Sequence, residues 1–456
     1  MGEATNTDGS SPFGRKLRKD FLFDKDYVNI NHGSFGTYPK PVQDALRNWQ
    51  NRAEARPDHF LRYDYPVELR RSRALMADYL NVPFETVVFV PNVTMGVNTV
   101  LRNLEYDDGD VIVYFATIYD ACEKTIKYIC ETTKAQEAKV EYTYPVEDEE
   151  LVRRFKEVVA GQKAIGRRVK IAIFDVVVSL PGVRMPFEAL TEACRELGVL
   201  SLIDGAHGVG HVELDLGKLD PDFFVSNCHK WLLTPRASAI FHVPLRNQPL
   251  MRSTLPTSHG FLPRPLPGAL PTINPLPPTG ESLFEENFAF TGTSDWSPFL
   301  CIAPALVYRA ALGGEAAIRT YCETLAREGG LRVAALLGTE VLENKTGTLG
   351  KCFFANVRLP LDLSVCEALA AVKAEERETA GKKAVRREAV PGLVKHWALR
   401  TMAKEYGGYQ ALIEYGGGWW ARLSTMVYLE MADFEWAAGV LKKICERAEK
   451  GEWLDG

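Results

Sequence analysis

Two stretches of sequence decide the fold: Leu202-Ile-Asp-Gly-Ala-His-Gly-Val-Gly210 and Phe223-Phe-Val-Ser-Asn-Cys-His-Lys-Trp231. In each, an apolar run typical of a buried strand ends in polar side chains, Asp204 and His207 in the first and Lys230 in the second. In parallel α/β sheets, ligands bind at the carboxyl ends of the strands. The two stretches therefore predict that a carboxylate, an imidazole and an amine lie at the ligand-binding edge of a sheet.

Short runs rich in β-branched residues alternate with helix-like segments through the central part of the chain. In Phe187–Leu197 apolar residues recur on one helical face, and Gly198 stands where a helix C-cap is expected. This alternation predicts βαβ units and an α/β fold with a mostly parallel central sheet covered by helices. The strand-like runs are Thr86–Val90, Val111–Phe115, Val169–Val178, Val199–Ile203, Phe223–Asn227 and Ala237–His242.

The chain divides into an N-terminal arm (1–60), a large domain (61–300) and a smaller C-terminal domain (301–456). After Ser297 the pattern becomes helical and then returns to a strand-like Phe353–Leu359, which predicts an α+β C-terminal domain. Residues 248–281 carry more prolines than a helix or central strand tolerates, and they predict a long surface loop. The charged segment 373–387 predicts a solvated face.

Composition limits the classes of partner. The chain has 456 residues, and 54 Lys and Arg against 59 Asp and Glu give a net charge of −5, so no basic field would recruit nucleic acid or an anionic membrane. Nine scattered cysteines without a C-x-x-C pair are typical of reduced thiols rather than a disulfide framework or a zinc site. The first residues lack the apolar core of a secretory signal, and no apolar stretch approaches membrane-span length. We therefore expect a cytoplasmic protein with no nucleic-acid, membrane or metal partner.

A phosphate site is predicted where Pro91-Asn-Val-Thr-Met-Gly-Val-Asn98 follows the strand-like run Thr86–Val90 and opens a helix. Backbone N–H groups at a helix N-terminus, together with the hydroxyl of Thr94, suit a single phosphate. The segment matches neither G-x-G-x-x-G nor the Walker pattern, which weakens dinucleotide and ATP interpretations. The alternative is that Asn92 or Thr94 only caps the helix.

A phosphate site, a carboxylate for a ring nitrogen and an amine for an aldehyde together indicate pyridoxal 5′-phosphate (PLP). Lys230 stands just past an apolar strand, where desolvation lowers the pKa of an amine and makes it nucleophilic. Asp204 would keep the pyridine nitrogen protonated, so that the ring withdraws electrons from Cα. Taken singly, these residues have other interpretations, namely a surface lysine and an Asx turn with a satisfied histidine at Asp204 and His207.

Over nearly its whole length the chain resembles the fold-type I PLP enzymes of the class V aminotransferase family, in their isopenicillin N epimerase-like branch. The resemblance implies that residues 61–300 bind PLP and that residues 1–60 contribute to the small domain and to a dimer. The matching motifs are Ile30-Asn-His-Gly-Ser34, Asn92–Asn98, Ser179-x-x-Gly182, Asp204-Gly-Ala-His207, Asn227-x-His-Lys-Trp231, Pro235-Arg236, Thr291-Gly-Thr-x-Asp295 and Arg422-Leu-Ser424.

The resemblance implies a role for each residue around the cofactor. Lys230 would form the Schiff base and remove the Cα proton, and Asp204 would meet the pyridine nitrogen. His207 and Ser179 would lie near the phenolic oxygen. Tyr119 would stack on the ring and is a candidate acid for the leaving group, with an ordinary half-buried tyrosine as the alternative. The phosphate ligands implied are Thr94, Met95, Asn227 or His229, and Gly292 and Thr293 from the neighbouring subunit, which implies a homodimer with shared active sites.

Arg422 would clamp the substrate α-carboxylate, a task suited to a planar guanidinium, and a surface salt bridge is its alternative. Asn31, His32 and Ser34 of the N-terminal motif are expected in the substrate site by the same resemblance. Five aromatic residues precede Arg422 and would attract a quaternary ammonium group, although core packing explains them at least as well. They are Tyr406, Tyr409, Tyr415, Trp419 and Trp420.

Within the family the pattern is most similar to the C–S lyases of ergothioneine biosynthesis. This similarity implies β-elimination from hercynylcysteine sulfoxide, which yields pyruvate, ammonia and a sulfenic acid that a thiol reduces to ergothioneine. The alternatives are an epimerase, a cysteine desulfurase and a PLP-binding scaffold without catalysis. A desulfurase needs a mobile cysteine nucleophile. Cys352 lies in a strand-like run and Cys228 adjoins Lys230, whereas position alone does not exclude Cys122.

Overall fold

The structure, a computed structural model, describes residues 12–257, 261–264, 267–268, 281–374 and 385–454. Much of the proline-rich segment 248–281 and most of the charged segment 373–387 lie outside the described residues. The predictions of a surface loop and of a solvated face for these segments therefore stay predictions.

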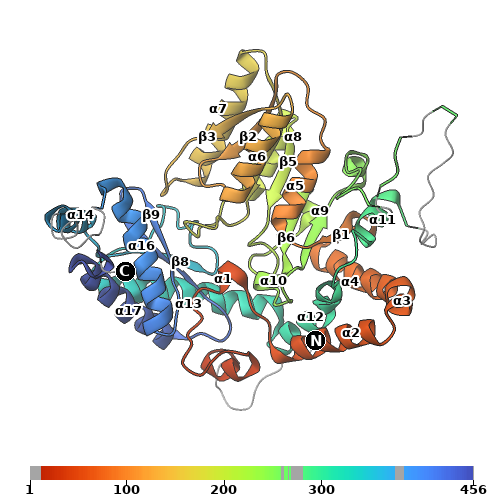
Figure 1. The fold of residues 1–456 in the computed structure, drawn as a ribbon. Helices are drawn as coiled ribbons and strands as arrows, with labels where there is room; N and C mark the ends of the chain where they lie inside the picture. Colours follow the sequence, from red (N-terminus) through yellow and green to blue (C-terminus); the bar gives the residue numbers. More distant parts are fainter. Residues whose placement is uncertain (1–11, 258–260, 265–266, 269–280, 375–384, 455–456) are drawn as a thin grey trace.

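A seven-stranded sheet forms the centre of the large domain, with the strand order β1-β7-β6-β5-β4-β2-β3 (Figure 1). β7 runs antiparallel to both of its neighbours, and the other neighbouring strands are parallel. The predicted α/β fold with a mostly parallel sheet is therefore confirmed. The strands are β1 (Val87–Val90), β2 (Asp110–Phe115), β3 (Gln136–Val140), β4 (Arg168–Asp175), β5 (Leu200–Asp204), β6 (Phe223–Asn227) and β7 (Ala239–His242).

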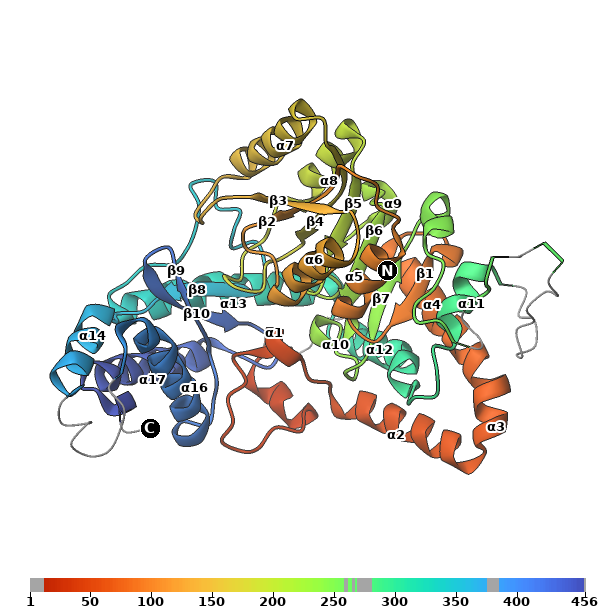
Figure 2. The same cartoon turned by 45° about the horizontal axis from the view of Figure 1, so that its top comes forward.

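Helices cover both faces of this sheet, because most of its strands are apolar along their whole length and have two faces to bury. Alternate residues of one strand enter different cores. Val88 and Val90 pack in the same core as the residues of α5 and α6, whereas Val87 and Phe89 pack with those of α4. The helices on the first face are α5 (Val93–Asn103) and α6 (Asp120–Thr132), and those on the second are α4 (Tyr65–Leu80), α7 (Asp148–Ala164) and α8 (Phe187–Leu197), as Figures 1 and 2 show.

The helix predicted at Phe187–Leu197 is present with those bounds as α8. Gly198 closes it with a φ of 68°, the left-handed conformation that glycine adopts without strain. The shorter elements of the large domain are η3 (Phe84–Thr86), α9 (Leu216–Leu219), α10 (Cys228–Trp231), η4 (Leu245–Leu250) and α11 (Leu283–Ala289).

The C-terminal part is the predicted α+β unit. Its three-stranded antiparallel sheet has the order β8-β10-β9, and α13 and α17 pack against each other beside it (Figure 1). The strands are β8 (Phe354–Arg358), β9 (Ala411–Tyr415) and β10 (Gly418–Ser424). The helices are η5 (Ser297–Cys301), α12 (Ile302–Ala311), α13 (Gly314–Leu337), α14 (Leu363–Val372), η6 (Arg387–Ala389), α16 (Val390–Glu405), α17 (Met431–Glu449) and η7 (Glu452–Leu454).

The start of the N-terminal arm lies against this C-terminal part. Val28 forms a β-bridge with Gly408, and the Arg15 guanidinium donates to Asp433 at 2.8 Å. We therefore propose the division into 1–60, 61–300 and 301–456. The arm contains η1 (Arg15–Asp20), α1 (His32–Phe35), α2 (Lys40–Ala55), α3 (Pro57–His59) and the π-helical turn η2 (Phe60–Asp64).

Two features of the large sheet differ from the sequence prediction. β3 was not predicted, because Gln136–Val140 is a largely polar edge strand whose side chains are mostly half-exposed. β4 ends at Asp175 rather than Val178, since Val177 leaves the sheet and pairs with the returning chain at Arg184.

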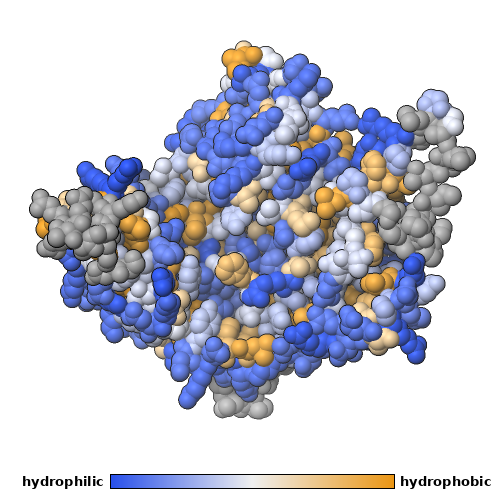
Figure 3. All heavy atoms as spheres, viewed as in Figure 1, coloured by the Kyte–Doolittle hydropathy of each residue, from blue (hydrophilic) through white to orange (hydrophobic). Residues whose placement is uncertain are grey.

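Hydrophilic side chains dominate the face of the molecule seen in Figure 3. Within the described ranges, no single helix combines the length and apolar character needed to cross a membrane, although the bent pair Ser297–Ala311 and Gly314–Leu337 meets that criterion jointly.

Candidate active site

Two buried carboxylates mark the carboxyl edge of the central sheet. Asp175 ends β4 and Asp204 ends β5, and the two are paired in register on neighbouring parallel strands. Residues in register project from the same face of a sheet. Their exposed fractions are only 3% and 2%, and burial raises the pKa of both carboxyl groups, with the charge of Asp204 adding to the effect on Asp175.

The hydrogen bonds of these carboxylates indicate which kind of ligand would bind between them. Asp204 accepts from the backbone N–H of Ala206 at 2.9 Å and from the thiol of Cys122 at 3.3 Å. Oδ2 of Asp175 is buried, and no hydrogen-bond partner for it occurs in the described part of the chain. A buried carboxyl pair with an unsatisfied oxygen suits a cationic partner such as a protonated ring nitrogen.

Lys230 reaches the same edge from α10, which begins directly after β6. Its Nζ lies 3.2 Å from Nε2 of His207, and the indole N–H of Trp231 donates to Nδ1 of that histidine at 3.0 Å. Burial, assisted by the charge of Arg422, lowers the pKa of Lys230 to about 8. At pH 7 roughly a tenth of the lysine is therefore a free amine, a far larger share than for a lysine with an ordinary pKa.

The short helix α1 packs closely against α10, the helix that carries Lys230. At Gly36, where φ is 64°, an added Cβ would lie 1.9 Å from the carbonyl oxygen of His229, so only glycine fits there. His32 contacts the carbonyl oxygen of Lys230 through Nε2 at 2.8 Å and the Tyr428 hydroxyl through Nδ1 at 2.9 Å. His32 thus holds the backbone of α10. The sequence placed His32 in the substrate site and did not predict this contact.

The predicted phosphate site lies at the start of α5, beside the end of β6. The Asn92 side chain accepts from the N–H of Met95 at 2.9 Å, and Asn227 Oδ1 accepts from the N–H of Val93 at 3.1 Å. Asn92 is therefore a helix cap, as the alternative interpretation held. The N–H and hydroxyl of Thr94 remain the first-turn donors best suited to an anion, and binding through Met95 would require displacement of the cap.

His229 and Ser179, expected beside the phosphate and the phenolic oxygen, have other contacts in this structure. Nδ1 of His229 lies 2.9 Å from the Ser238 carbonyl oxygen, and burial lowers the pKa of His229 to about 4. The Ser179 carbonyl oxygen accepts from Arg422 at 2.6 Å. These bonds fix the ring of His229 and the backbone of Ser179, and the expected roles of both residues beside PLP stay predictions.

Arg422 is buried on β10, with an exposed fraction of 2%. Its Nη2 donates to Asn31 Oδ1 at 3.0 Å and to Ser34 Oγ at 2.9 Å, and the guanidinium lies 4.5 Å from the centre of the Phe354 ring. Nε is buried and has no hydrogen-bond partner among the residues described. Burial lowers the pKa of Arg422 to about 10, so the group remains a cation at neutral pH. An orphaned cationic donor beside the lysine suits a carboxylate ligand.

Tyr119, Gly292 and Thr293 are less buried than the groups described above. Tyr119 precedes α6 and is 49% exposed, one helical turn before the buried Cys122. Gly292 is half-buried and Thr293 is exposed. Their neighbours Thr291 and Ser294 line a cavity of about 380 Å³ together with Met95. We propose that Gly292 and Thr293 contact a second subunit.

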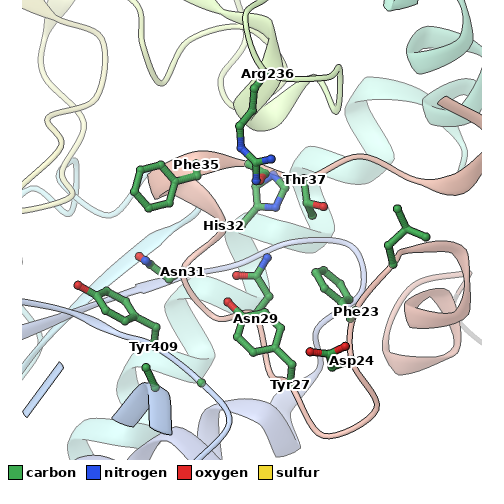
Figure 4. Close-up of a pocket in the computed structure, with 14 residues that line it drawn as sticks. Phe23, Asp24, Tyr27, Asn29, Asn31, His32, Phe35, Thr37, Arg236 and Tyr409 are labelled. Carbon is green, nitrogen blue, oxygen red and sulfur yellow. The ribbon is translucent and has the colours of Figure 1, made fainter. Parts of the chain in front are cut away.

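A cavity of about 510 Å³ is lined in part by Asn31, the side chain that accepts a hydrogen bond from Arg422. Figure 4 shows the residues around this cavity. Asn31 and Tyr409 lie on one side of it, and Phe23 and Asp24 on the other, whereas Arg236 enters from the large domain and donates to the Gly36 carbonyl at 3.0 Å. Because Asn31 contacts both Arg422 and this cavity, the cavity is a candidate site for the side chain of a substrate.

The structure corrects the interpretation of the aromatic cluster before Arg422. Tyr406 bonds to Arg447, and Tyr415 accepts from both the Trp420 indole and the Tyr144 backbone N–H. Trp419, on the other face of β10, has an exposed fraction of 4%. Core packing accounts for these side chains, and of the five only Tyr409 lines the cavity beside Asn31.

All nine cysteines are described as free thiols, and only Cys130 is not buried. Burial raises the pKa of Cys122 well above its usual value and that of Cys228 and Cys352 to about 12. Cys122, the one candidate nucleophile that sequence position did not exclude, donates its thiol proton to Asp204. A cysteine desulfurase requires a mobile cysteine that accepts the persulfide, and these buried thiols do not have that character.

Three residues of the site were missed by the sequence interpretation: Asp175, Cys122 as a partner of Asp204, and Trp231 as a partner of His207. Asp175 left a signal, since it is a carboxylate inside an otherwise apolar run. The hydrogen bonds of Cys122 and Trp231 left none, because each depends on the packing of separate elements.

The edge of the parallel sheet brings together an amine, a carboxylate pair, an imidazole and a helix N-terminus, and the C-terminal sheet adds a buried guanidinium. This arrangement is that of a fold-type I PLP enzyme. The unpartnered atoms of Asp175 and Arg422 fit the cofactor and an amino-acid substrate. Residues 37–246 match the family model for aminotransferase class-V. The chain belongs to this family, as relatives of similar length also show.

The chain is 39% identical over 444 residues to the L-cysteine desulfhydrase-like protein lolT1 of Epichloe uncinata, covering 95% of this chain and 96% of that protein. It is 26% identical over 433 residues to the hercynylcysteine sulfoxide lyase of Schizosaccharomyces pombe, covering 95% and 98%. Among solved structures, the apo cysteine desulfurase of Thermococcus onnurineus NA1 has a TM-score of 0.68 at 18% identity, covering 96% of this chain and 99% of that one. The protein is thus a PLP-dependent enzyme, and its relatives place it with the carbon–sulfur lyases of the family.

Proposed function

We propose that the enzyme cleaves the Cβ–S bond of a β-thio-substituted amino acid, with hercynylcysteine sulfoxide as the first candidate substrate. The observation that carries this proposal is the cavity of about 510 Å³ that Asn31, the hydrogen-bond partner of Arg422, helps to line. The volume of this cavity is larger than the side chain of free cysteine would fill. The similarity over nearly the full length to a hercynylcysteine sulfoxide lyase supports the same substrate class.

The cofactor and its lysine divide the chemistry between them. Bound through Lys230, PLP supplies an electron sink for the negative charge left at Cα when its proton is removed. Nζ of Lys230 is the base that takes this proton, and its lowered pKa of about 8 makes the free amine far more available at neutral pH than in an ordinary lysine. Asp204 and Asp175 form a carboxyl pair at the sheet edge, where a protonated ring nitrogen would bind and be balanced by their negative charge.

The remaining residues orient the substrate. Arg422 binds the α-carboxylate through its unpaired Nε and adjacent N–H groups, while Asn31 and Ser34 hold the guanidinium in place. We propose that the hydroxyl of Tyr119 delivers a proton to the departing sulfur group. Its 49% exposure leaves it free to approach a bound substrate.

A second candidate substrate is L-cysteine itself. Relatives that cover nearly the whole chain are named L-cysteine desulfhydrase-like proteins, and plant L-cysteine desulfhydrases match about half of it. An epimerase is a weaker alternative, since the matched isopenicillin N epimerase covers 65% of the chain at 29% identity. The complete set of Lys230, Asp204 and Arg422 argues against a scaffold without catalysis.

Parallel assays with hercynylcysteine sulfoxide plus a thiol reductant and with L-cysteine separate these candidates. We expect pyruvate and ergothioneine from the first at a higher kcat/KM than pyruvate and sulfide from the second. The variant Lys230→Ala is the blank. Preferred turnover of L-cysteine would move the assignment to a desulfhydrase, and Cα proton exchange without pyruvate would move it to an epimerase.

The substitution Tyr409→Ala tests the cavity directly. We expect it to lower kcat/KM for the large substrate by about 10-fold, as the loss of a buried aromatic contact would, and to leave L-cysteine turnover nearly unchanged. Equal losses for both substrates would contradict the assignment of the cavity to the leaving group.

We also propose that the enzyme is a cytoplasmic homodimer, with Gly292 and Thr293 facing the phosphate of the second subunit. The basis is the family resemblance and the partly exposed segment 291–294, in which Thr293 and Ser294 are exposed. Light scattering gives the assembly mass, and mixing of Lys230→Ala with Thr293→Ala chains tests the shared site through the regain of activity in heterodimers.

A further inference from the structure

Trp231, the residue after Lys230, is fully buried and lies at the centre of an aromatic cluster with His207, His211 and Phe354. Its indole N–H donates to Nδ1 of His207 at 3.0 Å. The other ring nitrogen of His207, Nε2, lies 3.2 Å from Nζ of Lys230. Two hydrogen bonds therefore link the indole to the amine through one imidazole.

The direction of these hydrogen bonds follows from which atoms can donate. An indole N–H can only donate, so Nδ1 of His207 must accept and carries no proton. A neutral imidazole has one ring proton, which then lies on Nε2. The doubly protonated ring is excluded because Nδ1 would point a proton at the indole N–H, and burial also lowers the pKa of His207 well below its usual value.

We propose that Trp231 is a positioning residue that fixes His207 with its proton on Nε2, so that His207 donates to Nζ of Lys230 and cannot accept from it. A neutral amine offers a lone pair to this donor, whereas an ammonium carries only donors. The arrangement stabilises the free amine, which is the form that attacks an aldehyde or removes a proton.

Other charged and titratable groups face the same two side chains. Positively charged groups lower the pKa of Lys230 and negatively charged groups raise it. All of these groups are present in every variant compared below. These groups are Arg422 from β10, Asp204 from β5, Asp175 from β4, His229 from α10, and His211. Trp231 also contacts the His211 ring, so the effect that passes through the His207 imidazole has to be isolated in a background that lacks this imidazole.

The test measures how fast the full-length chain, freed of cofactor, binds added PLP covalently as a function of pH. For the unmodified chain we expect the rate to rise with a midpoint near pH 8, where Lys230 loses its proton. In Trp231→Phe, His207 becomes free to accept from the ammonium. The midpoint should then rise by about one pH unit, the shift that one hydrogen bond to a charged group produces.

A double-mutant comparison distinguishes this role from simple packing. In a His207→Leu background, Trp231→Phe should cause no further shift of the midpoint, because the imidazole that transmits the effect is gone. A shift of the same size in that background, or no shift in the single variant, would overturn the proposal. Because no substrate is present, the outcome is independent of which thio amino acid the enzyme cleaves.

A second measurement needs no change at Trp231, in case that variant does not fold. In the cofactor-free chain labelled with ¹⁵N-histidine, the His207 signals are identified by their loss in His207→Leu. Near pH 7 we expect Nε2 to be protonated and Nδ1 to be bare. The reverse tautomer, or a ring protonated on both nitrogens, would refute the proposal that Trp231 fixes the proton of His207 on Nε2.

Discussion

Replacing Arg422 by lysine tests the carboxylate site more sharply than replacing it by alanine. The guanidinium donates to the Ser179 carbonyl, to Asn31 Oδ1 and to Ser34 Oγ. Alanine would leave three acceptors without their donor, at about 1–3 kcal/mol each where they are buried, and would confuse binding with folding. Lysine keeps the positive charge, but a single ammonium cannot reproduce the planar fork of the guanidinium.

The expected loss follows from the donors that remain for a ligand. Nε has no partner among the described residues, and a carboxylate bonded there gains a charge-assisted hydrogen bond. Losing that geometry costs about 1.5–3 kcal/mol, which corresponds to roughly a 10- to 150-fold fall in kcat/KM. The loss should fall mainly on KM, since the α-carboxylate is held equally in the ground and transition states.

Steady-state pyruvate formation gives kcat and KM, and a fluorescence titration gives PLP affinity. We expect PLP affinity of Arg422→Lys to be nearly unchanged, because Lys230 and Asp204 are intact. The control is Arg358→Lys, on the neighbouring strand β8, where an exposed side chain pairs with Glu340. A fall in kcat at constant KM, or a loss of PLP affinity in proportion to activity, would refute a carboxylate role for Arg422.

Three other predictions concern the groups at the sheet edge. Cys122→Ser keeps a donor for Asp204, so C–S cleavage should persist and mass spectrometry should find no persulfide on the native chain; a persulfide on Cys122 would restore the desulfurase assignment. Asp204→Asn should weaken PLP binding by about 10- to 100-fold in equilibrium dialysis. Asp175→Asn should weaken it less, because burial raises the pKa of Asp175 well above its usual range. The reverse order would contradict the assignment. In the cofactor-free chain the folded pKa of Lys230, about 8, lies below its unfolded value, so between these values the unfolded chain binds more protons. The free energy of unfolding should therefore gain up to about 3 kcal/mol as pH rises through this window, a gain that Lys230→Met lacks; equal pH slopes in denaturant titrations would count against the buried amine.

Much of the fold could be predicted because its signals are local. Apolar runs gave the central strands, and the period of Phe187–Leu197 with Gly198 gave a helix with correct bounds. The edge strand Gln136–Val140 was missed because its polar side chains resemble those of a loop, and only pairing with β2 makes it a strand. The C-terminal aromatic residues were ambiguous for the same reason, since composition does not tell whether a ring faces a ligand or a core.

By itself the sequence determined the alternation of the central strands with helices and the strand-end placement of Asp204 and Lys230, and through them the cofactor. These features depend on residues close together in the chain, so the local sequence pattern is enough to recognise helical periods and strand ends. Only the tertiary structure decided that Asp175 lies in register with Asp204, that Cys122 is bound to a carboxylate, and that Trp231 orients His207. Such contacts join side chains from separate elements, and strand register and close packing, which no local pattern encodes, determine which of them meet.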